Sequence, residues 1–216
     1  MAPESATTNG YSQSKWVSER ILEVSAEQTS LRPVIVRVGQ VSGGVNGSWN
    51  PLEWTPGIVQ SVTLTKALPS LGKAISLLPL RTSAQALVQA LSAKNGSSAL
   101  HLHLVNPTPS QWDDLFNHTA KKLDVPLIPY PEWFSKLREA STTVQNTQAH
   151  PALRLLEFYR SLNQASGPEV GGLPPCNAEV ARAICPVLNE ERLKDVKAEE
   201  IQRWLDYWES LGLLKS

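Results

Sequence analysis

The spacing of apolar residues near the start of the chain predicts a helix followed by a strand. Val17, Ile21 and Val24 recur at intervals of four and three residues, so residues 11–27 are expected to form a helix. Residues 33–38 are a short run rich in β-branched side chains. An apolar run of this length predicts a strand buried on both faces, as in a parallel sheet covered by helices. A helix followed by such a strand is half of a βαβ unit and indicates an α/β fold.

Three more elements are expected before residue 106. Residues 99–105 alternate leucine with histidine, which predicts a half-buried strand that carries His101 and His103 on its other face. Residues 45–80 have an irregular pattern, with a possible helix over residues 57–66. A helix is expected over residues 83–93, and its apolar stripe consists of Ala84, Leu87, Val88 and Leu91.

The second half of the chain has a helical pattern almost throughout. Ser110 and Asp113 resemble a capping box, which opens a helix that carries Trp112. A loop rich in Gly and Pro is expected at residues 167–175. Proline residues precede two of the later helices, and Gly212 closes the last. These further helices are expected at residues 132–140, 152–162 and 199–211.

The change of pattern near Asn106 divides the chain into two parts. Residues 1–106 are predicted to form an α/β portion with part of a parallel sheet. Residues 107–216 are predicted to form a mostly helical lobe.

Composition and charge restrict the classes of partner. The 216 residues include 20 basic and 20 acidic side chains, so the formal net charge is zero. Nucleic acids and anionic membrane surfaces attract clustered Lys and Arg, and we therefore expect neither partner. The sequence has no signal peptide pattern and no apolar run long enough to span a bilayer, so a soluble, cytoplasmic protein is expected. Cys176 and Cys185 are too few for a disulfide framework and are expected to be reduced thiols.

Tyr11 and Lys15 are the first candidates for chemistry. They lie four residues apart, so one face of the predicted helix carries both the phenol and the ammonium. A nearby ammonium favours the phenolate and lowers the pKa of a tyrosine, which would let Tyr11 act as an acid toward a carbonyl oxygen. The alternative is an ordinary pair of surface side chains.

Tryptophan and histidine residues are further candidates for binding roles. Trp49 and Trp54 lie in the irregular segment, where they are candidates for a substrate-binding wall. His101 and His103 form an H-x-H pattern that could ligate a metal, but no third ligand is evident. We therefore predict no metal site.

Five segments together resemble one family. They are G-Y-S-Q-S-K-W-V-S-E-R from residue 10, V-R-V-G-Q-V-S-G-G-V-N-G-S-W from residue 36, L-L-P-L from residue 77, L-V-N-P-T-P-S-Q-W-D-D-L from residue 104 and R-W-L-D-Y-W-E-S-L-G-L-L from residue 203. As a set they resemble the C-terminal part of the thioester reductase domain of fungal adenylate-forming reductases and carboxylic acid reductases. These domains belong to the extended short-chain dehydrogenase/reductase superfamily and are described as NAD-binding and male-sterility-like.

The resemblance implies a fold and a reaction. The fold would be the C-terminal half of a Rossmann-type parallel sheet, followed by a helical substrate lobe. The reaction would be NADPH-dependent release of an acyl thioester, held by a phosphopantetheine carrier protein, as an aldehyde.

The resemblance also implies roles for individual residues. Tyr11 would be the general acid, and Lys15 would bind the ribose of the cofactor. Trp112 and the helical lobe would cover the acyl or pantetheine channel. The nicotinamide would be lined by Val38, Gly39, Gln40 and Val41.

The sequence departs from the family in three ways. It has no G-x-x-G-x-x-G turn for the pyrophosphate, and Gly43, Gly44 and Gly47 come after the catalytic helix, which is the wrong order. The family's Ser or Thr upstream of the tyrosine is absent, and Arg81 stands where relatives usually carry Asp. We therefore expect the N-terminal half of the reductase domain to be a missing partner. The alternative is a catalytically inert remnant or a module that docks a carrier protein.

Overall fold

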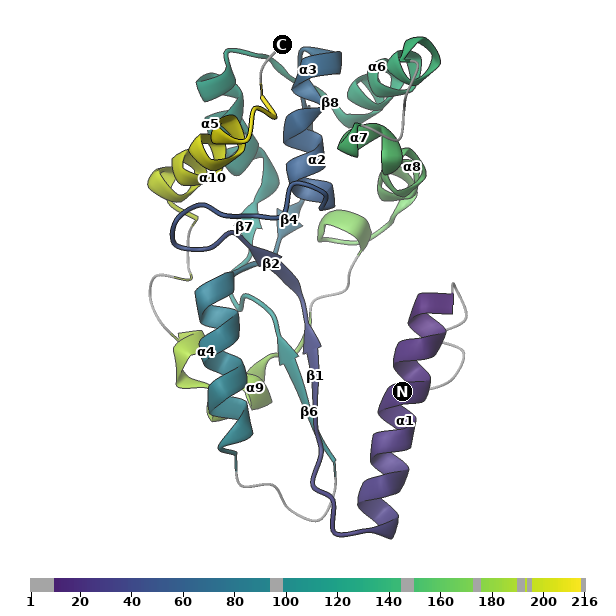
Figure 1. The fold of residues 1–216 in the computed structure, drawn as a ribbon, viewed down its shortest axis with the longest axis vertical. Coiled ribbons are helices and arrows are strands. Elements are labelled where there is room, and N and C mark those ends of the chain that lie inside the picture. Colours follow the sequence, from purple (N-terminus) through teal and green to yellow (C-terminus); the bar gives the residue numbers. More distant parts are fainter. Residues whose placement is uncertain are drawn as a thin grey trace.

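The chain folds as a mixed α/β structure (Figure 1). One part, the strand-containing part, is built on the two longest strands, at residues 34–38 and 100–104. The other, the helical part, is larger and mostly helical, and its strands are short. The computed structural model describes residues 10–93, 99–144, 150–172, 176–189, 193 and 196–214. The expected loop at residues 167–175 therefore lies partly outside the described residues. Its described part contains a short 3-10 turn, η3 (Val170–Gly172).

The strands form four pairs. β1 pairs with β6 in parallel, β2 with β5 and β3 with β8 also in parallel, and β4 with β7 antiparallel. The predicted strands at residues 33–38 and 99–105 are confirmed as β1 and β6, and the other six strands were not predicted. The eight strands are β1 (Val34–Val38), β2 (Gln40–Ser42), β3 (Leu68–Ser70), β4 (Ala74–Ile75), β5 (Leu77–Pro79), β6 (Leu100–Leu104), β7 (Ser110–Gln111) and β8 (Leu127–Pro129).

Most of the predicted helices are confirmed, with two of them divided. The expected helix at residues 57–66 is interrupted at Ser61, and the one at residues 152–162 is interrupted at Leu155. The helices are α1 (Gly10–Gln28), α2 (Trp54–Gln60), α3 (Val62–Thr65), α4 (Leu80–Leu91), α5 (Trp112–Leu123), α6 (Tyr130–Thr143), α7 (Pro151–Arg154), α8 (Leu156–Gln164), α9 (Glu179–Ile184) and α10 (Ala198–Ser210), with a 3-10 turn η4 (Pro186–Asn189).

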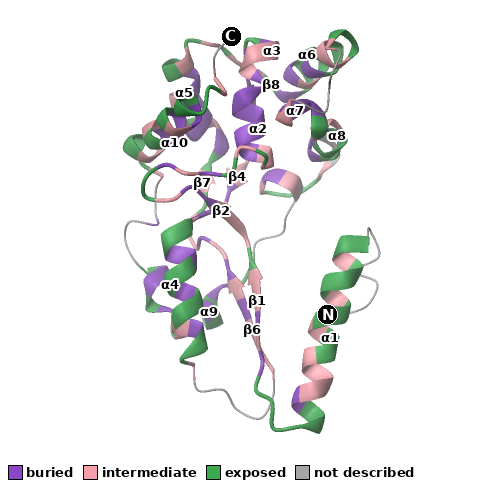
Figure 2. Cartoon of the chain, in the orientation of Figure 1, coloured by how far each residue is buried: buried purple, intermediate pink, exposed green. Residues whose placement is uncertain are grey.

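Two hydrophobic cores hold these elements together (Figure 2). The larger core joins α2 and β3 to the helices α5, α6, α8 and α10. The smaller core lies between the β1/β6 pair and the elements α4, α9 and η4. Each core contains residues from both sides of Asn106, so the chain passes between the two cores more than once.

The turn after β2 packs tightly on α10. Gly47 has a φ of 82°, and a Cβ at this position would lie 2.0 Å from the carbonyl oxygen of Arg203. A Cβ on Gly43 would lie 2.6 Å from Nε1 of Trp204. These glycines therefore let the backbone of the turn approach the C-terminal helix.

The burial of β1 differs from the prediction of a strand buried on both faces. Ile35 is buried, but Val34, Val36 and Arg37 are half-buried and Val38 is 47% exposed. The prediction was wrong because the side of β1 that carries Arg37 meets the charged side chain of Glu19 on α1, and not a wholly apolar helix face.

The predicted apolar stripe of α4 is also wrong. Leu87, Val88 and Leu91 are exposed, and Leu91 is 83% exposed. The helix instead turns small residues toward the strands, among them Ala86 and Ala90. Small side chains let the helix lie close to the sheet, which the spacing of large apolar residues did not indicate.

The predicted capping box is wrong as well. Ser110 lies in β7, and the residue before α5 is Gln111, which makes no side-chain cap. The Asp113 carboxylate instead accepts hydrogen bonds from the Ser70 hydroxyl at 2.7 Å and the Leu71 N–H at 2.9 Å. This aspartate therefore joins α5 to the end of β3.

Replacing Gly47 with alanine should destabilise the protein more than the same change at Gly72. Both glycines have positive φ, but a Cβ at Gly72 would meet nothing within 4 Å. Gly72→Ala therefore measures backbone strain alone, about 1 to 2 kcal/mol, whereas Gly47→Ala adds a collision with Arg203. Urea unfolding of the two variants measures the difference. Equal losses would show that the turn does not need to approach α10 so closely.

Candidate functional site

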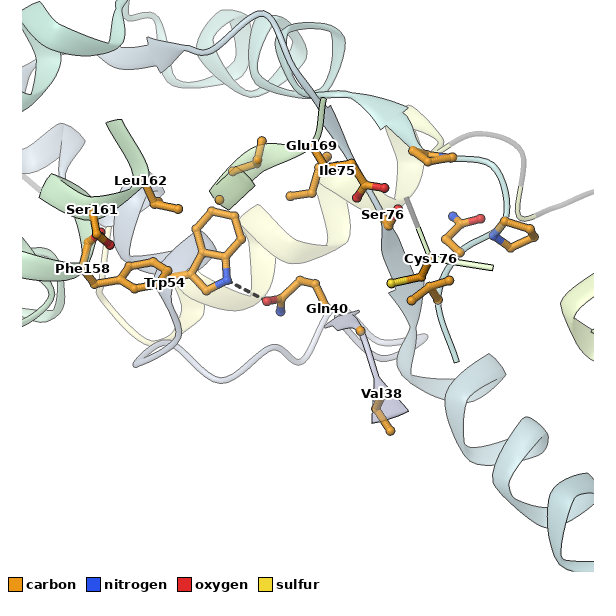
Figure 3. Close-up of a pocket in the computed structure, with 17 residues that line it drawn as sticks. Val38, Gln40, Trp54, Ile75, Ser76, Phe158, Ser161, Leu162, Glu169 and Cys176 are labelled. Carbon is orange, nitrogen blue, oxygen red and sulfur yellow. Dashed lines mark hydrogen bonds between the residues drawn. The ribbon is translucent and has the colours of Figure 1, made fainter. Parts of the chain in front are cut away.

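A pocket opens where the parallel strands β1 and β6 end (Figure 3). Its volume is about 550 Å³, and its lining is mostly apolar. Val38 and Gly39 come from the end of β1, and Val105 follows β6. Ligands of α/β sheets bind at the carboxyl ends of parallel strands, so this position favours a binding site. The helical part closes the pocket with Trp54, Phe158, Leu162, Glu169 and Val170.

Gln40 joins the end of the strands to α2. Its Oε1 accepts a hydrogen bond from Nε1 of Trp54 at 2.6 Å, and its Nε2 donates to the Val41 carbonyl at 2.9 Å and to Glu53 Oε2 at 3.2 Å. The same Glu53 oxygen accepts from Nε1 of Trp49 at 3.0 Å. The amide of Gln40 therefore determines how the Trp54 indole faces the pocket.

The Trp54 indole is also supported from behind. It stacks on Trp112 with ring centroids 5.8 Å apart and an angle of 8° between the planes. The hydroxyl of Tyr159 donates to the Trp54 carbonyl at 2.8 Å. Burial raises the pKa of Tyr159 far above its ordinary value, so this phenol remains a neutral donor.

Tyr11 and Lys15 lie together on α1 but outside the lining of the pocket. The Lys15 ammonium is 5.2 Å from the centroid of the Tyr11 ring, which is a cation–π arrangement. Tyr11 is 73% exposed. The helix places the two groups on one face, as the spacing predicted, and leaves that face open to solvent.

Ion pairs connect α1 to the strands β1 and β6. Arg37 of β1 donates from Nε to Glu19 Oε1 at 2.8 Å, and a second guanidinium nitrogen contacts Glu19 Oε2. His101 Nε2 lies 3.1 Å from Glu23 Oε1. In α1 the one fully buried residue is Ala26. The hydrogen bonds from Arg37 hold the pKa of Glu19 below its ordinary value of 4.5.

These contacts also account for the two histidines on β6. His101 faces Glu23, and Nε2 of His103 lies 3.2 Å from a guanidinium nitrogen of Arg37. Within the described ranges, no three His, Cys, Asp or Glu side chains are grouped closely enough to hold a metal ion.

The other predicted site residues have different placements. Val38, Gly39, Gln40 and Trp54 line the pocket. Val41 pairs with Leu78 inside the β2/β5 ladder and does not line it. Trp49 packs against Trp204 and Trp208 in the larger core, and Trp112 is fully buried behind Trp54.

Several residues that line the pocket were not predicted. Asn106 is buried, and its amide donates to the carbonyls of Leu77 and Leu193 at 2.9 and 3.0 Å. Phe158 and Leu162 come from α8, and Glu169 comes from the loop rich in Gly and Pro. Glu169 carried no motif signal, because its relation to the strands exists only in the folded chain.

Comparisons with known proteins match this arrangement. Residues 1–87 match the NAD-binding family model described as male sterility protein. The chain is 34% identical over 96% of its length to the adenylate-forming reductase Nps10 of Heterobasidion annosum. It is 31% identical over 98% of its length to the non-reducing polyketide synthase pigA of Monascus ruber.

A solved structure shows the same fold. All of this chain superposes on 53% of the terminal R domain from the myxalamid PKS-NRPS biosynthetic pathway, with a TM-score of 0.76 and 26% identity. The chain belongs to this family of NAD-binding, male-sterility-like reductase domains. It spans 20% of the Heterobasidion relative and 8% of the Monascus relative.

The chain has the fold of such a reductase domain, with an α/β part of Rossmann type and a mostly helical part. A bilayer-spanning helix is not found among the described residues, whose helices are all too short or too polar.

A double-mutant cycle tests whether Gln40 holds Trp54. Gln40→Ala and Trp54→Phe each remove the 2.6 Å hydrogen bond. If the two residues act as a unit, the losses of unfolding free energy should fall short of additivity by about 1 kcal/mol. Urea unfolding of the two single variants and the double variant gives this coupling energy. Additive losses would show that the indole is held by its stacking alone.

The Glu19–Arg37 pair should make the protein sensitive to acid. Because the pKa of Glu19 is lowered by folding, its stabilisation is present above the ordinary value of 4.5 and is lost as the pH falls through the lowered pKa. Glu19→Gln should cost about 1.5 kcal/mol near neutral pH and less at about pH 3. Urea unfolding at both pH values checks this.

Glu157→Gln is the matched control, because Glu157 also pairs with an arginine but is exposed. We expect it to cost little at either pH. An equal effect of the two substitutions would contradict a structural role for Glu19.

Proposed function

We propose that this chain supplies the acid helix and the acyl pocket of a thioester reductase domain. The substrate is an acyl group on the phosphopantetheine arm of a carrier protein, the hydride donor is NADPH, and the product is an aldehyde. The observation that carries the proposal is the break between β1 and β2 at Gly39, which lies against an apolar pocket lined by Gln40 and Trp54.

The residues present fit one end of the cofactor. The segment from Val38 to Gln40 lies at the carboxyl end of the parallel pair β1 and β6, where a nicotinamide of this fold class binds. The glycines after β2 do not fit a pyrophosphate, because the space beside them is already filled by the protein: a Cβ would lie 2.6 Å from Trp204 at Gly43 and 2.0 Å from Arg203 at Gly47. We therefore assign the nicotinamide end of NADPH to this chain and the pyrophosphate to the rest of the domain.

Tyr11 and Lys15 would carry out the proton transfer to the substrate. When bound, NADPH supplies the hydride to the thioester carbonyl carbon. The Tyr11 phenol would donate its proton to the carbonyl oxygen, and Lys15 would hydrogen-bond the ribose and favour loss of that proton. In the resulting hemithioacetal the C–S bond would break and the hydroxyl proton would pass to the leaving sulfur, which gives the aldehyde and the free pantetheine thiol.

The exposed face of α1 fits the rest of such a domain as a partner. Tyr11, Val17 and Ile21 are exposed apolar or aromatic residues on this helix, and β1 pairs along one edge only among the described strands. The superposition leaves nearly half of the terminal R domain without a counterpart in this chain. We propose that the corresponding half covers α1 and brings Tyr11 to the pocket.

The test uses a longer protein in which this chain follows the N-terminal half of such a reductase domain. It should oxidise NADPH in the presence of an acyl-phosphopantetheine carrier protein, and mass spectrometry should detect the aldehyde. Tyr11→Phe should lower the rate about 100-fold or more, because the general acid is lost. Tyr207→Phe is the control, since Tyr207 packs on the larger core, and should leave the rate unchanged.

Two outcomes would contradict the proposal. Full activity of the Tyr11→Phe protein would exclude Tyr11 as the acid. Tight binding of the carrier protein without any NADPH oxidation would favour a docking module instead.

A further inference from the structure

The pocket has an apolar end and one acidic group (Figure 3). Trp54, Phe158 and Leu162 form the apolar end. Gln40 and Glu169 lie between this end and the part lined by Ser76 and Cys176. Among the described residues that line the pocket, Glu169 is the one with a carboxylate.

The backbone around Glu169 is fixed. Glu169 forms a parallel bridge with Ala74, and the next residue, Val170, is buried in the larger core. Gly171 then turns the chain with a φ of 81°. The carboxylate is therefore presented to the pocket from an ordered segment.

The two amide side chains of the pocket are occupied by the protein. Gln40 bonds to Trp54, Glu53 and Val41, and the amide of Asn106 bonds to two carbonyls. Across the part of the chain that the structure describes, no ion pair or hydrogen bond engages the side chain of Glu169. Glu169 thus retains its full capacity to accept hydrogen bonds from a ligand.

We propose that Glu169 determines substrate specificity by binding an amino group on an acyl chain that ends in an apolar or aromatic group. This inference rests on the proposed function, in which the thioester carbonyl lies beside the segment from Val38 to Gln40. The apolar terminus then contacts Trp54 and Phe158, and the amino group lies on the carbons between carbonyl and terminus.

Electrostatics select the sign of the substituent. An ammonium near a partly enclosed carboxylate gains a charge-assisted hydrogen bond, whereas a carboxylate substituent is repelled and loses its hydration. Among the described residues, no cation of the protein pairs with Glu169. The positive charge that balances this carboxylate therefore has to come from the ligand.

The test is isothermal titration of the 216-residue chain with N-acetylcysteamine thioesters on one carbon skeleton. The probes are the 3-phenylpropanoyl thioester, its 2-amino and 3-amino derivatives, and its 2-carboxy derivative. At least one amino probe should bind about ten-fold or more tightly than the unsubstituted probe, and the carboxy probe should bind more weakly. Glu169→Gln, which keeps the shape of the side chain, should abolish both differences.

Glu157→Gln is the matched control, because this exposed glutamate of α8 pairs with Arg160 and does not line the pocket. It should preserve the preference for the amino probes. The role of Glu169 is wrong if the unsubstituted probe binds and the amino probes bind no more tightly, or if Glu169→Gln preserves the tighter binding of the amino probes. Either result would still support the pocket as the acyl-binding site. If no probe binds, the pocket assignment fails and the inference falls with it.

Discussion

The hydrogen bond between the Gln40 amide and the Trp54 indole is the contact on which the arrangement of the pocket depends. Gln40 is the first residue of β2, and Trp54 is the first residue of α2, so this contact joins the end of the β1/β6 pair to the helical part. The amide also donates to Glu53, which accepts from Trp49 in the larger core. Removing one buried or half-buried polar group from such a network leaves its hydrogen-bond partners unpaired. The positions of Gln40, Glu53 and the two indoles therefore depend on one another.

The two sides of the β1/β6 pair are held by different forces. The side of Leu102 and Leu104 packs on α4 and α9 through apolar contacts. The side of Arg37 and His103 meets α1 through ionic contacts, and α1 buries little apolar surface. A helix attached in this way is more easily displaced than one packed on a core, because partly exposed ion pairs contribute less than apolar burial. The candidate acid therefore lies on a helix that buries a single residue, Ala26, which is consistent with the proposal that a further part of the domain covers it.

Sequence patterns correctly predicted elements whose formation depends on residues that are close together along the chain. The apolar spacing of residues 11–27 predicted α1, and the alternation of Leu and His predicted β6 and its buried face. The Tyr11 and Lys15 pair follows from helix geometry alone. The spacing of α4 was misleading, because Leu87 and Leu91 form a regular stripe that faces solvent while Ala86 and Ala90 meet the strands. Which face of an amphipathic helix is buried depends on the elements that it meets.

The sequence by itself determined the family, the order of the main elements and the position of the Gly39–Gln40 turn after a strand. Only the tertiary structure decided that Trp54 lines the pocket while Trp49 and Trp112 are buried, although all three were predicted to line or cover the substrate site. It also decided that Glu169 faces that pocket, more than a hundred residues from the turn at its other side. The physical reason is that propensity and periodicity act over a few residues, whereas a pocket is defined by packing between segments that are distant along the chain.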